Sequence, residues 1–191
     1  MRDIRQIRYV QGDATAPEGT GLKIIAHVCN DAGAWGAGFV MALSRRWPEP
    51  EAAYRKWHQI RAINDFGLGA VQMVTVSPDI QVANMVGQHG AGYAGSRPPV
   101  RYEAIGRALG QLARNAGTHA GRPAASVHMP RIGCGLAGGD WGCIEPLILD
   151  RLCSHAIWVT VYDLPPGSAA PGTARPAGSG RTGILPAPGR G

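Results

Sequence analysis

The sequence contains few lysines, few aromatic residues and no long apolar run. Of 191 residues, 6% are aromatic, and only Lys23 and Lys56 are lysines among the 19 basic residues. Because no stretch of about 18 apolar residues occurs, the sequence predicts no membrane-spanning helix. Residues 1–5 also lack the apolar stretch of a secretory signal peptide, so we expect no contact with a membrane.

Cysteine is also scarce. The four cysteines, Cys29, Cys134, Cys143 and Cys153, include no C-x-x-C pair. Their spacing fits neither a zinc site nor a disulfide framework, which argues against a small domain held together by metal or disulfides. We therefore expect reduced thiols, a cytoplasmic location, and neither a metal nor a cofactor.

The net charge is +6 and is carried almost wholly by arginine. Three of the arginines, Arg175, Arg181 and Arg190, lie near the C-terminus, where no acidic residue offsets them. The remaining excess is modest and forms no basic stripe with interleaved aromatic residues. It is compatible with an anionic small ligand. A nucleic-acid partner is possible but gains no support from this charge pattern.

The composition divides the chain at residue 165. Residues 165–191 are rich in proline, glycine and alanine, and their only large apolar residues are Ile184 and Leu185. These are too few to offset the entropy of ordering, so we predict a disordered tail. Residues 1–164 contain enough apolar residues for a core and are predicted to form one domain.

Within residues 1–164, strand patterns alternate with helix patterns. Lys23–Cys29 is a nearly continuous apolar strand, typical of a strand with both faces covered. Ala70–Val76 and Ile80–Val86, separated by Ser-Pro-Asp, predict an antiparallel hairpin. The other predicted strands are Ile4–Val10, Ser126–Ile132 and Ile157–Tyr162, and the predicted helices are Phe39–Trp47, Glu49–Ile63, Tyr102–Ala116 and Trp141–Cys153. This order predicts an α/β domain whose mixed sheet is covered on both faces.

Two glycine-rich turns each follow an apolar strand and precede a helix. The first spans Gly33–Phe39 and the second spans Gly133–Gly139. Such a turn lets backbone N–H groups and a helix N-terminus approach a phosphate closely. One turn of this kind is weak support for an anion site, but two in one small domain predict a cradle for a nucleotide diphosphate.

The second turn contains the G-x-G-x-x-G spacing at Gly133, Gly135 and Gly138. In a dinucleotide-binding dehydrogenase this pattern occupies the first strand-to-helix turn, and an acidic residue follows about 20 positions later. Here the pattern occurs near the end of the domain, which argues against a dehydrogenase. Neither turn carries the lysine of a Walker motif, which argues against hydrolysis of nucleoside triphosphates.

Three polar residues within or just after predicted strands allow two interpretations each. Asp13 can accept a hydrogen bond from the amine of a base, or it can cap its own turn. Asn30 lies where ligands bind at the carboxyl edge of an α/β sheet, but it can equally shape the turn that follows. His27, inside the apolar strand, is either a catalytic group or a core histidine whose hydrogen bonds are satisfied.

Gln88 and His89 lead from the hairpin into the glycine-rich residues 90–96. A loop of this kind can fold over a ligand, or it can be a plain surface connection. Trp35 and Phe39 flank the first glycine-rich turn, where either can contact a ribose or pack beneath the turn. The residues alone do not decide between these interpretations.

Four ordered motifs resemble those of a known family. Residues 27–31 together with Gly36–Phe39 resemble the first ligand loop of macrodomains, which bind ADP-ribose, and residues 129–136 (MPRIGCGL) resemble the second loop. Gly12-Asp13 and residues 159–164 (VTVYDL) also match. The resemblance covers residues 4–164 and is greatest to the branch with terminal ADP-ribose glycohydrolase and the bacterial antitoxins that remove ADP-ribose from DNA. It implies a three-layer α/β/α sandwich with a mixed, mostly parallel sheet.

This resemblance implies a role for particular residues. Asp13 would accept a hydrogen bond from the adenine amine, Ala14 would offer its backbone N–H, and Asn30 would contact the distal ribose. Tyr162 or Asp163 would border the adenine. The backbone amides that would wrap the diphosphate belong to Gly36, Ala37, Gly38, Phe39, Gly133, Cys134, Gly135 and Leu136, and Ile132 would also contact the ligand.

The sequence departs from the glycohydrolase branch at both catalytic positions. That branch has a lysine that attacks the ribose, whereas this chain has Gln88, which cannot form the adduct. The branch has a catalytic aspartate where this chain has Ala137, with Asp140 three residues later. Asn30, Gln88 and Asp140 are therefore the candidate catalytic residues of a non-covalent route.

Three functions are compatible with these residues. The first is hydrolysis of the ester between mono-ADP-ribose and an acidic side chain of a protein, with a water attacking the ribose. The second is removal of phosphate from ADP-ribose 1″-phosphate. His27 would then be the acid or base, because the stretch from His27 to Gly36 also resembles a yeast macrodomain with that activity. The third is binding of ADP-ribose without turnover. We expect a monomer whose partners are ADP-ribose and ADP-ribosylated proteins.

Overall fold

The computed structural model describes residues 6–117 and 124–165, and their six strands form one sheet in the order β1–β6–β5–β2–β4–β3. The strands are β1 (Ile7–Gln11), β2 (Lys23–Asn30), β3 (Val71–Ser77), β4 (Ile80–Gln88), β5 (Ser126–Pro130) and β6 (Val159–Asp163). The helices are α1 (Phe39–Arg46), α2 (Glu49–Gln59), α3 (Tyr102–Ala116) and α4 (Trp141–Arg151). Of the predicted disordered tail 165–191, all but the first residue lies outside the described residues.

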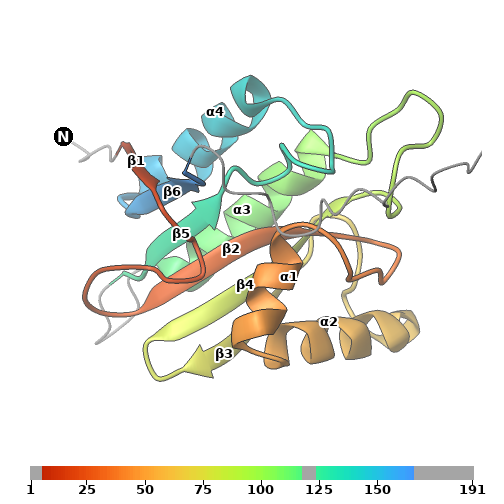
Figure 1. Ribbon diagram of the computed structural model, residues 1–191, viewed down its shortest axis with the longest axis horizontal. Coiled ribbons are helices and arrows are strands. Elements are labelled where there is room, and N and C mark those ends of the chain that lie inside the picture. The colour runs from red at the N-terminus through yellow and green to blue at the C-terminus, as the bar shows by residue number, and fades with distance from the viewer. Residues whose placement is uncertain (1–5, 118–123, 166–191) are drawn as a thin grey trace, which may run out of the picture.

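Helices cover both faces of this sheet. Neighbouring strands run parallel except β3 and β4, which pair antiparallel and confirm the predicted hairpin. Helices α1 and α2 lie on one face, and α3 and α4 lie on the other (Figure 1). The predicted three-layer α/β/α arrangement is therefore confirmed.

The apolar run of β2 is continuous because its two faces pack into two different cores. Ile24 and Ala26 are fully buried in the core beneath α3 and α4, while Ile25 and Cys29 are buried in the core beneath α1 and α2. Successive side chains of a strand point to opposite faces of the sheet. Every side chain of a central strand must therefore be apolar or hydrogen-bonded within the protein. The strand β2 is thus packed on both faces, and its carboxyl end is Asn30.

The face of β5 and β6 turned away from α3 and α4 carries a buried polar network. His128 is 2% exposed; its Nδ1 lies 3.0 Å from the Tyr162 hydroxyl, and its Nε2 lies 2.9 Å from the Ser126 hydroxyl. The Tyr162 hydroxyl also accepts a hydrogen bond from the Glu18 N–H, at 3.4 Å. The segment that follows β1 is thereby joined to β6.

Three predicted helices end earlier than the sequence pattern indicated: α1 ends at Arg46, α4 ends at Arg151, and α2 is shortened the most. The helix predicted over Glu49–Ile63 ends at Gln59, and the short 3-10 turn Arg61–Ile63 follows it. The Asn64 side chain donates to the Trp57 carbonyl and accepts from the Phe66 N–H, so it closes the chain after the helix. In the part of the chain that the structure describes, no helix is long and apolar enough to cross a bilayer.

Candidate active site

The sheet order places a topological switch point at the carboxyl edge of the sheet, and we call the place where its two loops part the crevice. After β2 the chain turns toward α1 on one face, and after β5 it turns toward α4 on the opposite face. Because β2 and β5 are neighbours, their outgoing loops part at this point. Such a topological switch point is where open α/β sheets bind ligands. The two glycine-rich turns are these two loops.

Asn30 shapes the first glycine-rich turn. Its side-chain oxygen accepts hydrogen bonds from the N–H groups of Ala32 and Ala34, both at 3.0 Å, and its amide nitrogen donates to the Ala34 carbonyl at 2.7 Å. The Tyr54 hydroxyl lies 3.1 Å from the same oxygen. Asn30 therefore does what a turn former does, and it has little free hydrogen-bonding capacity left for a ribose. Trp35 is 6% exposed and packs beneath the turn against Tyr54.

The second glycine-rich turn closes on itself and touches the first. The Gly138 N–H donates to the Gly135 carbonyl at 3.0 Å, and the Gly139 N–H donates to the Gly133 carbonyl at 2.8 Å. The Leu136 side chain, 59% exposed, lies 3.5 Å from the position that a Cβ on Gly38 would take. Since Gly38 belongs to the first turn, Leu136 joins the two turns over the crevice.

Several backbone amides of these turns have no protein partner. Within the described residues, no acceptor is found for the N–H groups of Gly36, Ala37, Gly135 and Leu136. All four residues are exposed. Backbone donors are obligatory hydrogen-bonding groups, so these four are available to solvent or to an anion. Both turns that were predicted to cradle a diphosphate thus present free donors at the same crevice.

The structure brings two of the three candidate catalytic residues together. Asn30 and Gln88 are cross-strand partners at the ends of β2 and β4, and the Gln88 side chain makes no hydrogen bond within the described residues. Asp140 lies elsewhere, at the beginning of α4, where its Oδ1 accepts from the Gly142 N–H at 2.8 Å. No hydrogen bond in the described part of the chain joins Asp140 to either of the others.

His27 is enclosed by the core between β2 and α1. It is 1% exposed, and its Nε2 lies 2.6 Å from Asn84 Oδ1. Burial lowers the pKa of His27 to about 4, with the bond to Asn84 opposing that shift, so the ring is neutral at neutral pH. In this arrangement His27 is a satisfied core histidine and does not reach the crevice.

A loop over residues 89–99 covers part of the second turn. The Tyr93 hydroxyl lies only 2.0 Å from where a Cβ on Gly138 would be, so the Tyr93 ring occupies the space that this glycine leaves. At its start the loop is bound to Asp31, which accepts from the Gly90 N–H at 2.7 Å. Asp31 was not among the candidate residues predicted from the sequence. Its position directly after a strand is the same signal that identified Asn30 at the end of that strand.

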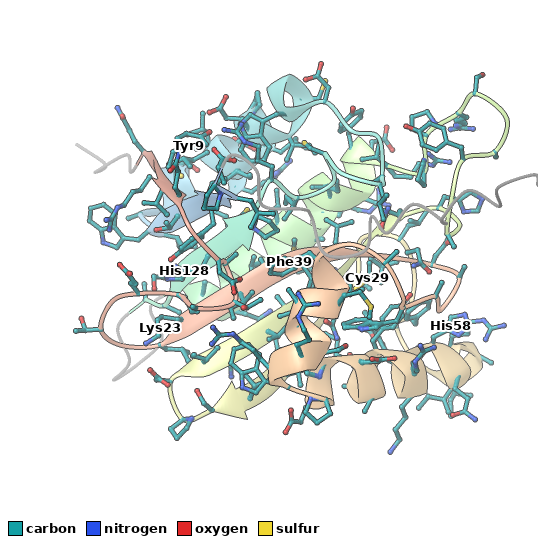
Figure 2. All side chains as sticks on the ribbon, viewed as in Figure 1. Tyr9, Lys23, Cys29, Phe39, His58 and His128 are labelled. Atoms are coloured by element: carbon teal, nitrogen blue, oxygen red, sulfur yellow. The ribbon has the colours of Figure 1, made fainter. Side chains whose placement is uncertain are left out.

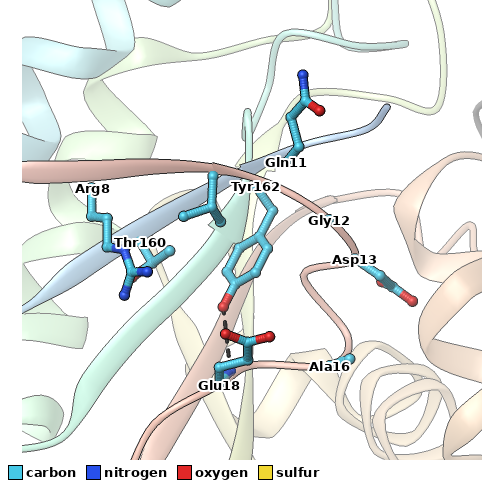
Figure 3. A pocket seen from close by; sticks show the side chains of 9 residues that line it. Arg8, Gln11, Gly12, Asp13, Ala16, Glu18, Thr160 and Tyr162 are labelled. Atoms are coloured by element: carbon cyan, nitrogen blue, oxygen red, sulfur yellow. Dashed lines mark hydrogen bonds between the residues drawn. The ribbon is translucent and has the colours of Figure 1, made fainter. Parts of the chain in front are cut away.

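A small pocket lies at the other end of the same sheet edge, near β1 and β6. It measures about 180 Å³, and Gly12, Asp13 and Tyr162 line it (Figure 3). Asp13 Oδ1 accepts from the N–H and hydroxyl of Thr15, so Asp13 caps its turn as one interpretation proposed. The N–H of Ala14 has no acceptor within the described residues. The residues expected to border an adenine are therefore gathered in one place.

Asp163, at the end of β6, is held by Arg131 at the end of β5. The guanidinium makes two hydrogen bonds to this carboxylate, at 2.6 and 2.8 Å. It also lies 5.3 Å from the centre of the Tyr9 ring and 5.0 Å from that of Trp141. This cluster fixes the geometry of the strand ends beside the small pocket.

No group of histidine, cysteine, aspartate or glutamate residues in the described ranges could hold a metal ion. Cys29 and Cys153 are buried and Cys134 is half-buried. Burial raises the pKa of each of these three thiols, which keeps them protonated and unreactive.

No family model matches the chain. Solved structures, however, do match it. A macrodomain protein from Streptomyces coelicolor is 63% identical, with a TM-score of 0.73, over 83% of this chain and 99% of that one. The chain belongs to the macrodomain family. This macrodomain is also 30% identical to the chromodomain-helicase-DNA-binding protein 1-like of Mus musculus, over 96% of this chain. It spans only 20% of the length of that relative.

A shorter match concerns an enzyme. Over 54 residues the macrodomain is 32% identical to an ADP-ribose 1″-phosphate phosphatase of Lodderomyces elongisporus. The match covers 27% of this chain and 33% of that protein.

Proposed function

We propose that this macrodomain binds ADP-ribose and hydrolyses the ester that joins mono-ADP-ribose to acidic side chains of proteins, by direct attack of water. The observation that carries the proposal is the pair of glycine-rich turns with free, exposed amides at one crevice. A diphosphate supplies the anionic oxygens that such donors bind. The macrodomain fold, which implies ADP-ribose binding, supports the same ligand.

The order of the features along the sheet edge matches the order of the parts of ADP-ribose. The pocket with Asp13 and Tyr162 lies at β1 and β6, the two turns follow β5 and β2, and Gln88 ends β4. Neighbouring strands are about 4.8 Å apart, so these strands span about 19 Å. In this placement the adenine lies at the pocket, the diphosphate lies at the turns, and the distal ribose lies beside Asn30 and Gln88.

The ester bond itself is suited to cleavage by water. When the bond between the ribose C1″ and the ester oxygen breaks, the carboxylate leaves with the electron pair and positive charge spreads onto the ring oxygen. The free amides beside the diphosphate, together with the Gln88 side chain, position the ribose and a water molecule. Asp140 Oδ2, which has no partner within the described residues, is the candidate base that accepts the proton of the water once its loop bends toward the ribose, because in this structure Asp140 lies apart from Asn30 and Gln88.

The match to an ADP-ribose 1″-phosphate phosphatase favours a second candidate function, removal of that phosphate. In that reaction His27 would act as acid or base. Its exposure of 1% and its bond to Asn84 weigh against this role, because the ring would first have to leave the core. Phosphate release from ADP-ribose 1″-phosphate, compared between the wild type and His27→Gln, tests this alternative.

The test of the proposal is chromatographic release of ADP-ribose from a protein mono-ADP-ribosylated on glutamate. We expect release well above the spontaneous hydrolysis of the ester, and a strong decrease for Gln88→Ala. Calorimetry with ADP-ribose is run in parallel. Binding without release would identify a macrodomain that binds ADP-ribose without turnover, and absence of both would overturn the proposal.

A further inference from the structure

A second hollow, larger than the pocket at β1 and β6, measures about 430 Å³ and lies at the beginning of α3. We name it the arginine hollow, because Arg97, Arg101 and Arg107 line it. It is formed by the end of the loop over residues 89–99 and by the beginning of α3. The proposed function assigns nothing to it.

The charges of the arginine hollow are not neutralised by the protein. Within the described residues, none of its three guanidinium groups forms an ion pair. Arg101 donates to the carbonyls of residues 98, 99 and 100, and Arg107 donates to the Leu68 carbonyl. Glu103 also lines the hollow, so three positive charges meet one negative charge there. Backbone carbonyls orient Arg101 and Arg107 but leave a net positive site.

Most N–H groups of these three arginines are not used in hydrogen bonds within the described residues. A guanidinium has five N–H groups, and the bonds of Arg101 use only its Nη1, while those of Arg107 use only its Nη2. The Arg97 side chain makes no hydrogen bond within the described residues and is exposed. The hollow therefore offers several N–H donors on charged guanidinium groups. Two parallel N–H groups of a guanidinium match the two oxygens of a carboxylate.

The segment that lines the arginine hollow also forms one wall of the proposed active site. Val100 pairs with Gln88, and the Val100 N–H donates to the Ala137 carbonyl at 3.2 Å. Pro98 Cβ lies 3.0 Å from the position that a Cβ on Gly138 would take. When an acidic side chain is linked to the distal ribose near Gln88, the residues next to it in the modified protein can thus reach the arginine hollow.

We propose that the arginine hollow binds carboxylates of an acidic segment of the modified protein, next to the glutamate or aspartate that carries ADP-ribose. This inference rests on the proposed function for the position of the ester. The shape of the site favours a polypeptide over a nucleic acid. Single-stranded nucleic acid is bound along a groove of cations with stacked aromatic rings, whereas here the three arginines converge on one hollow.

The test compares two peptides that carry one mono-ADP-ribosylated glutamate, flanked by glutamates in one and by glutamines in the other. The enzyme variant is the double substitution Arg97→Gln and Arg107→Gln. Both side chains are exposed, so the core stays intact. Arg151→Gln, at the far end of α4, is the control that removes a positive charge outside the hollow.

We expect the double variant to raise KM for the acidic peptide about fivefold. KM for the neutral peptide and the affinity for free ADP-ribose should remain unchanged.

A binding experiment separates this inference from the proposed function. Fluorescence anisotropy of a labelled polyglutamate peptide, with ADP-ribose at saturation, needs no turnover. If the double variant loses this binding while the wild type cleaves no ester, the inference about the arginine hollow is supported and the proposed hydrolysis is refuted. Equal binding by wild type and double variant, or tighter competition by a single-stranded oligonucleotide than by polyglutamate, would overturn the inference.

Discussion

Asp31 Oδ2 lies 2.7 Å from His89 Nδ1, across 58 residues of sequence. The other carboxylate oxygen accepts the Gly90 N–H at the same distance, so Asp31 holds the first two residues of the loop that reaches Tyr93. Burial works to raise the pKa of Asp31, but the bonds from Gly90 and His89 outweigh it and the pKa lies below its usual value. The end of β2 and the loop over the second turn are therefore coupled by a charged side chain.

Replacing this carboxylate should loosen the loop. Asp31→Ala removes both charge-assisted hydrogen bonds, which are typically worth about 1.5–3 kcal/mol and less at a partly exposed site. We expect the amides of residues 89–99 to exchange hydrogen about tenfold faster, measured by mass spectrometry. Asp150→Ala, at the exposed end of α4, is the matched control. Unchanged exchange would mean that other contacts, such as the bond from the His89 N–H to the Pro99 carbonyl, hold the loop without Asp31.

The diphosphate site can be tested at Gly135 without harming the fold. A Cβ at this position meets no atom within 4 Å, and Gly135 is not among the glycines with positive φ. Gly135→Glu should therefore fold normally yet place a carboxylate among the free amides, where it repels the phosphates. We expect calorimetry to detect no ADP-ribose binding by this variant and near-normal binding by Gly135→Ala. Undiminished binding by Gly135→Glu would show that the diphosphate lies elsewhere.

Much of the fold was predictable because local signals agreed with it. The unbroken apolar run of β2 predicted a central strand, and the Ser-Pro-Asp turn predicted the hairpin of β3 and β4. The glycines of both turns marked the crevice, since Gly38 and Gly138 have positive φ that other residues rarely adopt. The ends of helices were less predictable, because the Asn64 side chain closes α2 through contacts that no periodicity reveals.

The roles of single polar residues were harder to predict, because they depend on contacts distant in sequence. Whether Asn30 meets a ligand or shapes its turn depended on hydrogen bonds to Ala32, Ala34 and Tyr54. Asp31 gains its role from His89, and the arginine hollow exists only because a loop and the beginning of α3 fold together. No spacing rule connects such residues in the sequence.

Asp140 caps α4, so its catalytic role must be separated from its structural one. Asp140→Asn keeps a side-chain oxygen for the Gly142 N–H but removes the basic carboxylate. If Asp140 is the base, this variant should lose about 100-fold in kcat with an unchanged Tm. Asp140→Ala should show the same loss and in addition cost about 1 kcal/mol of stability. A normal kcat for Asp140→Asn would assign Asp140 to the helix cap alone.

The position of the lysines predicts that no covalent adduct forms. Lys23 is 5% exposed at the amino end of β2, where it is bound to Asp79, and Figure 2 shows it far from Phe39, which follows the first glycine-rich turn. Lys56 lies on α2. Sodium borohydride should therefore trap no ribose adduct on the wild type during turnover. Gln88→Lys supplies an amine at the strand end and should yield a trapped adduct by mass spectrometry. Trapping on the wild type would require a covalent route through one of its two lysines.

The two buried histidines predict that acid destabilises the fold. Burial lowers the pKa of both His27 and His128 to about 4, helped at His128 by the charges of Lys23 and Arg8. In the unfolded chain a histidine titrates near pH 6.5, so between these values the unfolded state binds more protons. Stability should then fall as the pH falls from about 6.5 to about 4, by about 2 kcal/mol per histidine between pH 7 and pH 5. Urea unfolding at the two pH values measures this loss. His128→Gln should remove about half of it, and a stability independent of pH over this range would contradict the neutral, buried state of both rings.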